Sequence, residues 1–234
     1  HLFRLFFKET MNSYDRVMAA LRREQPDRVP VMEFVVDPKI AKALFPDCKD
    51  TADCMDRLNL DVVGCGSQFL PVQTNADGSW VDEWGVTYKD NIEVVPHPMR
   101  GPISSMDDLR RYQPPDPLRP ERLGVLPDLV RRYKGKRAIL FHQRAAFMWS
   151  AYLNGLDNLL ANFLTEPEFC DALLDLALNV NMAIARQAIR AGADAIVLGD
   201  DYAHNRGPLM SPKTFHRFVF PRLKRMVDLI HAEG

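Results

Sequence analysis

Residues 191–221 read AGADAIVLGDDYAHNRGPLMSPKTFHRFVFP, and this stretch decides the fold. Within it, residues 194–199 (DAIVLG) form a short apolar run between turn residues, which is typical of a strand covered on both faces. Asp200 and Asp201 follow at once, a Gly-Pro pair then turns the chain, and Ser211 begins a new helix. A buried strand between two helices predicts a parallel α/β fold, in which ligands bind at the carboxyl ends of the strands.

Two adjacent carboxylates at such a strand end are the leading candidates for catalytic groups. Successive side chains of an extended segment point in opposite directions. We therefore expect one of Asp200 and Asp201 to face a pocket and the other to be structural, as a cap or ion pair for the following loop. Tyr202 and His204 lie in the same loop and are candidates for substrate binding.

Three earlier apolar runs, at residues 28–36, 61–65 and 137–141, predict three further strands, with helical patterns between them. The first run contains Glu33. An acid inside a buried strand is either paired or directed into a pocket, and these two alternatives have equal weight.

A polar triplet, His142, Gln143 and Arg144, follows the run at residues 137–141, as Asp200 and Asp201 follow theirs. For His142, a role as a satisfied interior histidine and a role in the pocket have equal weight. Arg144 is the stronger candidate, because a guanidinium there can pair with an anionic substrate or with one of the two aspartates.

Residues 68–96 have a different sequence pattern from the strand–helix units. Asp77-Gly78 separates alternating runs, which is a strong hairpin signal, and a further run includes residues 92–95. This pattern predicts a small antiparallel meander inserted after the second strand. We expect Trp80 and Trp84 to seal the meander onto the main core rather than to bind a ligand.

Four strand–helix units are half of a (β/α)8 barrel, and such barrels run to about 250 residues in total. Because the 234 residues also include a meander and long loops, we expect only about the first half of the barrel. Residues 11–234 would then be the N-terminal part of one barrel domain. Residues 1–10, HLFRLFFKET, lack a signal-peptide cleavage pattern, and we expect them to be a non-native or disordered leader.

Composition excludes several classes of partner. The chain has 30 basic and 31 acidic residues, a net charge of −1, which gives no electrostatic case for nucleic acid or for an anionic membrane. No apolar run approaches the ~20 residues of a membrane helix. The four cysteines are scattered and form no Cys-x-x-Cys motif, so we expect a reduced, cytoplasmic setting.

Several stretches together resemble the uroporphyrinogen decarboxylase superfamily. The stretches are PDRVPV at 26–31, DEWG at 82–85, a helix ending in AGAD at 191–194, LGDDYAHNRGPLMSP at 198–212 and FHRFVFPRLK at 215–224. The resemblance covers residues 13–234. It implies a (β/α)8 barrel and one of two activities: cofactor-free decarboxylation of uroporphyrinogen, or methyl transfer between a corrinoid protein and a thiol or folate acceptor.

The sequence departs from the pattern of the decarboxylases at three places. Where they carry the arginine-rich MRQAGRY after the first strand, residues 32–40 read MEFVVDPKI. Where they carry an aspartate at the end of the second strand, residues 61–66 end in small residues, and Tyr152 is about two residues out of register with their tyrosine. The many carboxylates of uroporphyrinogen would find few arginine partners, which favours the methyltransferase branch.

That branch implies a corrinoid as co-substrate, a small-molecule acceptor, and a corrinoid protein as a partner. Asp200 or Asp201 would orient the acceptor or handle its proton, and His142, Gln143 and Arg144 would line the pocket. Members that activate thiols hold zinc through a His-x-Cys pair on the fifth strand and a distant Cys. Its position lies beyond Gly234, so we expect no metal ligand in this chain.

Two alternatives remain open. The first is decarboxylation of uroporphyrinogen in tetrapyrrole (heme) biosynthesis. The second is an inactive, truncated binding module. A half-barrel disfavours the second, because it leaves two open strand edges and uncovered apolar surface. A homodimer that covers those edges would remove this objection.

Overall fold

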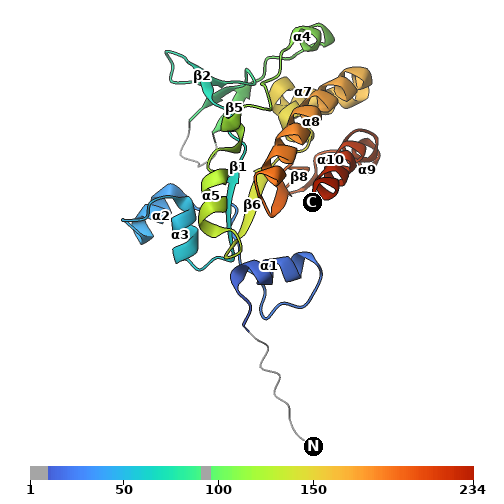
Figure 1. Ribbon diagram of the computed structural model, residues 1–234. Helices are drawn as coiled ribbons and strands as arrows, with labels where there is room; N and C mark the ends of the chain where they lie inside the picture. The colour runs from blue at the N-terminus through green and yellow to red at the C-terminus, as the bar shows by residue number, and fades with distance from the viewer. Residues whose placement is uncertain (1–9, 91–95) are drawn as a thin grey trace, which may run out of the picture. The chain divides into compact units, whose positions relative to one another are not determined.

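The computed structural model describes residues 10–90 and 96–234 (Figure 1). Most of the predicted leader (residues 1–9) and the predicted strand residues 92–95 lie outside the described residues. The chain divides into two compact units. The first consists of His1–Cys65, Val125–Phe141 and Ala191–Ala195, and the second of Gly66–Gly124, His142–Arg190 and Ile196–Gly234.

Three strands form a sheet in the order β1-β6-β7, namely β1 (Val62–Gly66), β6 (Ala138–Gln143) and β7 (Ala195–Leu198). The amide of Ala138 donates to the carbonyl of Asp61, and further along both strands the amide of Ser67 donates to the carbonyl of His142. The pairing therefore advances in the same direction along both strands, which makes them parallel. The first four residues of the central strand β6 are buried, as expected for a strand covered on both faces.

The prediction of a first strand at residues 28–36 is wrong. These residues have no strand structure, and Val29 is 80% exposed. One backbone hydrogen bond, from the amide of Asp61 to the carbonyl of Val31, joins the segment to the residues before β1. An apolar sequence forms a strand only where a neighbouring strand can pair with it, and Pro30 has no N–H to donate. The sheet therefore has three strands in place of the four that we expected.

Helices of the first unit begin at side-chain caps that the sequence supplies locally. They are α1 (Ser13–Leu21), α2 (Pro38–Leu44), α3 (Thr51–Arg57) and α5 (Leu126–Tyr133). Asn12, Asp37 and Asp50 cap the first three, each accepting a hydrogen bond from a backbone N–H two or three residues ahead. Leu126 and Leu129 of α5 are buried, so this helix contributes to the core of the unit.

The region in which the sequence predicts a meander forms a four-stranded antiparallel sheet in the second unit. Its strands follow chain order: β2 (Pro71–Thr74), β3 (Trp80–Asp82), β4 (Thr87–Lys89) and β5 (His97–Arg100). Trp84 is fully buried and stacks on Trp149 of α6 (Phe147–Asn154) with 4.5 Å between ring centroids. Trp80 stacks on Tyr88 instead, within the sheet. Trp84 thus seals the sheet onto the helices, whereas Trp80 does not.

The remaining elements of the second unit are mostly helical. They are α4 (Met106–Arg111), a 3-10 turn (Pro120–Leu123), α6 (Phe147–Asn154), α7 (Leu156–Thr165), α8 (Pro167–Arg190), a two-strand ribbon of β8 (Ala203–His204) and β9 (Gly207–Pro208), α9 (Pro212–Thr214), a π-helical turn (Phe215–Val219) and α10 (Phe220–Glu233). The long helix α8 lies beside α10 (Figure 1). Arg222 of α10 joins the two through Asp171 and Asp175.

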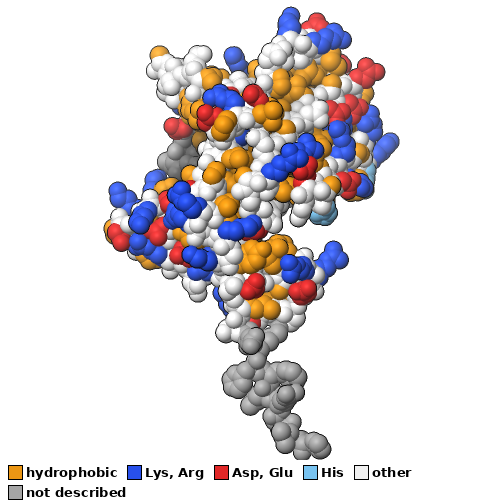
Figure 2. All heavy atoms as spheres, viewed as in Figure 1, with side chains coloured by type: hydrophobic (Ala, Val, Ile, Leu, Met, Phe, Trp, Pro, Cys, Tyr) orange, Lys and Arg blue, Asp and Glu red, His pale blue; other side chains and the backbone are white. Residues whose placement is uncertain are grey.

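Charge is mixed over the surface. Figure 2 shows basic and acidic side chains interspersed on the visible face, in keeping with the net charge of −1. In the portion of the chain that the structure describes, no helix is both long enough and apolar enough to cross a membrane.

Candidate functional site

Asp200 lies immediately after β7, and its carboxylate faces the start of α6. Oδ2 accepts hydrogen bonds from the amides of Ala146 and Phe147, both at 3.0 Å, and Oδ1 accepts a longer one from Met148 at 3.3 Å. Burial raises the pKa of Asp200, and the three amide hydrogen bonds only partly oppose this. The carboxylate therefore acts as a cap for a helix that begins more than 50 residues earlier in the chain.

Asp201 differs from its neighbour, because its side chain is 72% exposed. The nearest cation is Arg144, whose Nη1 lies 3.9 Å from Oδ2 of Asp201. At this distance and exposure the ion pair contributes little to stability. One aspartate of the pair is thus engaged in structure and the other is open to solvent, as the alternation of side chains implies.

Arg144 follows β6 and is held from two sides. Its Nη1 donates to the carbonyl of Gly199 at 2.5 Å, and its guanidinium carbon lies 5.4 Å from the centre of the Tyr152 ring. Tyr152 meets Trp149 edge-on at 5.6 Å, and Trp149 stacks on Trp84. The guanidinium therefore lies against the first of three aromatic rings in contact with one another, and 28% of the Arg144 side chain is exposed.

Tyr202 completes what we call the strand-end cluster, which consists of Arg144, Tyr152, Asp200, Asp201 and Tyr202. The Tyr202 hydroxyl lies 3.4 Å from Oδ2 of Asp200, and its ring packs near Phe147 and Phe215. Burial, followed by the nearby Asp200 carboxylate, raises the pKa of the Tyr202 phenol, so it stays protonated at neutral pH. Burial likewise raises the pKa of Tyr152, although Arg144 opposes the shift.

The other predicted site residues have different surroundings. Gln143 is buried: Oε1 accepts from Ser67, and Nε2 donates to the carbonyl of Asn181 in α8. His142 is partly buried, and burial lowers the pKa of its imidazole. His204 is exposed, and its Nδ1 accepts from the amide of Arg206 within the ribbon. Glu33 belongs to the first unit and is exposed in the segment that forms no strand.

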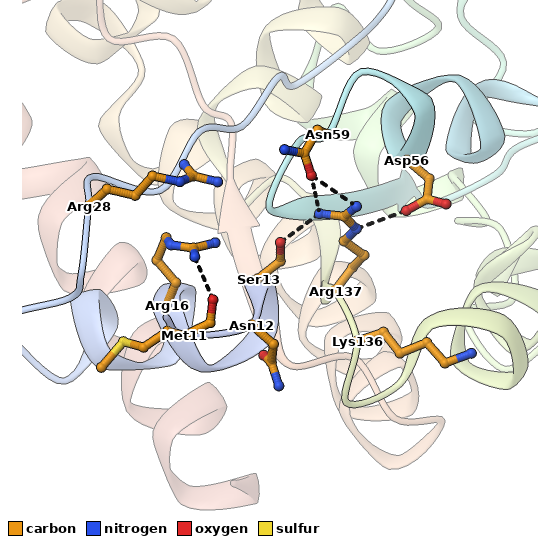
Figure 3. Close-up of a pocket in the computed structure, with 9 residues that line it drawn as sticks. All are labelled: Met11, Asn12, Ser13, Arg16, Arg28, Asp56, Asn59, Lys136 and Arg137. Carbon is orange, nitrogen blue, oxygen red and sulfur yellow. Dashed lines mark hydrogen bonds and ion pairs between the residues drawn. The ribbon is translucent and has the colours of Figure 1, made fainter. Parts of the chain in front are cut away.

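A pocket of about 520 Å³ lies within the first unit, and no predicted site residue lines it (Figure 3). Its basic lining residues are Arg16, Arg28, Lys136 and Arg137. Figure 3 shows the Arg137 guanidinium directed at Asp56, Ser13 and Asn59, all three of which it contacts through hydrogen bonds. The Lys136 amine points away from the three guanidinium groups.

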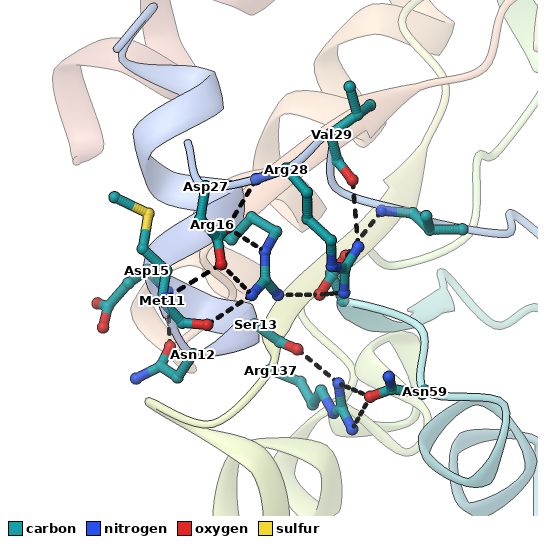
Figure 4. Close-up of polar contacts among 12 residues, drawn as sticks. Met11, Asn12, Ser13, Asp15, Arg16, Asp27, Arg28, Val29, Asn59 and Arg137 are labelled. Atoms are coloured by element: carbon teal, nitrogen blue, oxygen red, sulfur yellow. Dashed lines mark hydrogen bonds and ion pairs between the residues drawn. The ribbon is translucent and has the colours of Figure 1, made fainter. Parts of the chain in front are cut away.

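In the wall of this pocket, two guanidinium groups share one buried carboxylate (Figure 4). Arg16 and Arg28 both bind Asp61, and Arg16 also binds Asp27 through two hydrogen bonds. The amide of Val31 donates to Asp61 as well. Since carboxylates already engage the three arginines, the arrangement ties α1, the 27–31 segment and the starts of β1 and β6 together. Sequence spacing could not reveal it, because the partners lie in four separate segments.

For metals, the sequence predicts no ligand in this chain and places any zinc ligands beyond Gly234. Among residues 10–90 and 96–234, no three His, Cys, Asp or Glu side chains converge as metal ligands would. The described residues therefore do not fit a zinc site. Cys48, Cys54 and Cys170 are free thiols.

With this geometry in hand, we compared the chain with known proteins. The profile of the uroporphyrinogen decarboxylase (URO-D) family matches residues 12–234. The chain belongs to the URO-D family. The family resemblance inferred from the PDRVPV, DEWG and GDDY stretches is thereby confirmed.

Relatives within the URO-D family include both chemistries. Methylcobamide:CoM methyltransferase MtbA of Methanosarcina acetivorans is 23% identical over 227 residues, which are 92% of this chain and 65% of that protein. Uroporphyrinogen decarboxylase of Geobacter metallireducens is 25% identical over 152 residues, which are 61% of this chain and 44% of that protein. The chain thus spans 65% of the length of MtbA.

The fold is also that of a solved structure. A methyltransferase from Methanosarcina mazei superposes with a TM-score of 0.69 at 18% identity, over 94% of this chain and 67% of that one. At this identity the similarity establishes an α/β fold of the URO-D type.

Proposed function

We propose that this URO-D family member transfers a methyl group between a corrinoid carrier and a thiol or folate acceptor. The observation that carries the proposal is the composition of the strand-end cluster, which has one guanidinium, that of Arg144, and one exposed carboxylate, that of Asp201. Such a cluster can pair with one anionic group of the acceptor. A substrate with many carboxylates would require more cations than this cluster contains.

Each exposed polar group of the cluster has a role in this proposal. Arg144 binds the anionic group of the acceptor, since its guanidinium is already oriented by Gly199 and Tyr152. Asp201 accepts the proton that the acceptor loses as it becomes a nucleophile. The corrinoid, when bound, supplies the methyl group. We also propose that the strands described here are part of a (β/α)8 barrel and that the corrinoid arrives on a partner protein.

Similarity along the chain supports the same choice. The matches to MtbA of Methanosarcina acetivorans and to MtaA of Methanosarcina barkeri cover 92% and 94% of the chain, against 61% for the decarboxylase. Residues 32–40, MEFVVDPKI, contain no arginine.

The direct test is to incubate the full-length protein with methylcobalamin and, separately, thiol and folate acceptors, and to follow demethylation of the corrinoid by absorbance. We expect demethylation with at least one acceptor. Its absence with every acceptor would reject the proposal. The matched control is Arg144→Gln, which should bind the acceptor more weakly while remaining folded.

Decarboxylation of uroporphyrinogen is the second candidate, because a decarboxylase is among the relatives. Incubation with uroporphyrinogen and chromatography of the product distinguish the two. Formation of coproporphyrinogen would establish the decarboxylase and overturn the assignment to methyl transfer.

A further inference from the structure

The start of α6 obtains its cap from a distant part of the chain. Ala146 stands at the N-cap position and provides no side-chain hydrogen bond. The first amides of a helix have no partner within the helix and need one from outside. Asp200 supplies it, with both carboxylate oxygens directed at the amides of residues 146–148. A negative charge at this end also interacts favourably with the helix dipole.

The same helix carries the aromatic support for Arg144. Tyr152 lies in α6, and its ring lies under the Arg144 guanidinium. Arg144 in turn donates to the carbonyl of Gly199, the residue next to Asp200. The contacts therefore close into a ring that runs from Asp200 through α6 and Tyr152 to Arg144 and back to Gly199. Asp200 is therefore connected to the guanidinium both through α6 and through Gly199.

The hydrogen-bonding capacity of the two carboxylates separates their roles. A carboxylate has about four sites for accepting hydrogen bonds. Asp200 receives three amides and lies 3.4 Å from the Tyr202 hydroxyl, so its sites are taken. Asp201 is 72% exposed, and among residues 10–90 and 96–234 its ion pairing is limited to the long contact with Arg144. It alone of the two can accept a proton from a bound molecule without uncapping α6.

We infer that Asp200 is a positioning residue, which holds α6 and through it Tyr152 and Arg144, and that Asp201 is the carboxylate that touches the substrate. Only the role of Asp201 rests on the proposed function. The coupling of Asp200 to Arg144 is structural and can be tested without an activity assay.

The first experiment measures that coupling by two readouts on the full-length protein. Hydrogen exchange reports the amides of Phe147 and Met148, and phenylglyoxal modification mapped by mass spectrometry reports the accessibility of Arg144. In Asp200→Ala we expect exchange at these amides to rise about fivefold or more, the scale of losing a helix cap, and Arg144 to react several times faster. Asp200→Asn, which keeps one acceptor oxygen, should fall between.

Asp201→Ala and Asp157→Asn are the controls for this experiment. Asp201→Ala removes the neighbouring charge, and Asp157→Asn removes an exposed charge from the first turn of the next helix, α7. Neither should change the exchange of the α6 amides. If Asp200→Ala and Asp200→Asn leave both exchange and Arg144 reactivity at wild-type values, the positioning role is wrong.

The second experiment uses methyl transfer. Asp200→Asn should raise KM for the acceptor about tenfold through misplacement of Arg144, with a smaller change in kcat. Asp201→Asn should lower kcat about tenfold or more, with a smaller change in KM. A large loss of kcat in Asp200→Asn, with wild-type kcat in Asp201→Asn, would overturn the division of roles. An inactive wild-type protein would reject the proposed function, while the exchange and modification results would still decide whether Asp200 positions Arg144.

Discussion

Nη1 of Arg16 lies 2.6 Å from Oδ1 of Asp61, a carboxylate whose side chain has no exposure to solvent. Asp61 also accepts two hydrogen bonds from Arg28. Burial would raise the pKa of Asp61, but the hydrogen bonds from Val31, Ser13 and the two arginines outweigh it and lower the pKa. A buried charge is tolerated only with such partners, so this carboxylate organises the first unit.

Replacing Asp61 should therefore be costly. In Asp61→Asn two guanidinium groups lose their shared partner, and we expect the free energy of unfolding to fall by about 3 to 5 kcal/mol. Urea denaturation followed by circular dichroism measures this. The control is Asp47→Asn, which removes the partner of Arg57 at a side chain 80% exposed and should cost under about 1 kcal/mol. Equal losses in the two variants would contradict a central role for Asp61.

The buried carboxyl of Asp82 predicts that the free energy of unfolding falls as the pH rises. Burial raises its pKa from 3.8 to about 6, although the amides of Val86 and Trp84 donate to it. Because the folded pKa exceeds the unfolded one, the contribution of Asp82 to stability is present below about pH 4 and is lost as the pH rises through 6.

The measurement compares wild type with Asp82→Asn by denaturation at several pH values from 4 to 7. We expect the wild type to lose up to about 3 kcal/mol relative to the variant over this range. The difference between the two proteins cancels the titration of all other groups. A difference that stays constant with pH would show that Asp82 has an ordinary pKa.

A side chain at position 101 would clash with the backbone at the end of α6. A Cβ built on this residue would lie 2.0 Å from the carbonyl oxygen of Leu153 at the end of α6. Gly101→Ala should therefore force the backbone apart and cost about 1 to 3 kcal/mol, measured by thermal or urea denaturation. Gly66→Ala is the control, because its Cβ would meet nothing closer than 3.4 Å. A neutral Gly101→Ala variant would mean that the backbone yields freely there.

Arg144→Lys predicts an effect on activity. Lysine keeps the positive charge but lacks the planar group that stacks on Tyr152 and donates to Gly199. We expect KM for the acceptor in the methyl-transfer assay to rise about tenfold, with a smaller change in kcat. Arg110→Lys is the matched control, since Arg110 is 70% exposed and pairs with Asp107 in its own helix. Equal kinetics for the two variants would remove Arg144 from acceptor binding.

Local pattern was sufficient to predict the strands near residues 61–65, 137–141 and 194–199, because a buried strand shows itself as a short apolar run between turn residues. The same pattern failed at residues 28–36. There the apolar run is real, but pairing with a neighbour is a property of the fold and not of the run. Val29 and Phe34 are accordingly exposed.

The candidate site was predictable in position but not in its internal roles. The spacing of Arg144 and Asp200 after their strands indicated that polar groups gather there. The capping of α6 by Asp200 depends on residues more than 50 positions apart, and no pattern in the sequence joins them. Tyr152, noted at first only for its register, is the residue that supports the guanidinium.

The π-helical turn at Phe215–Val219 has a consequence for the helix that follows it. Pro221 lacks the N–H that a regular helix would use, and the wider turn accommodates one additional residue. Each residue of an α-helix advances the side-chain direction by about 100°. The additional residue therefore rotates the later part by that amount, so that Phe215 faces Tyr202 while Arg222 faces α8. The segment from Phe215 to Glu233 thereby contacts Tyr202 through Phe215 and α8 through Arg222.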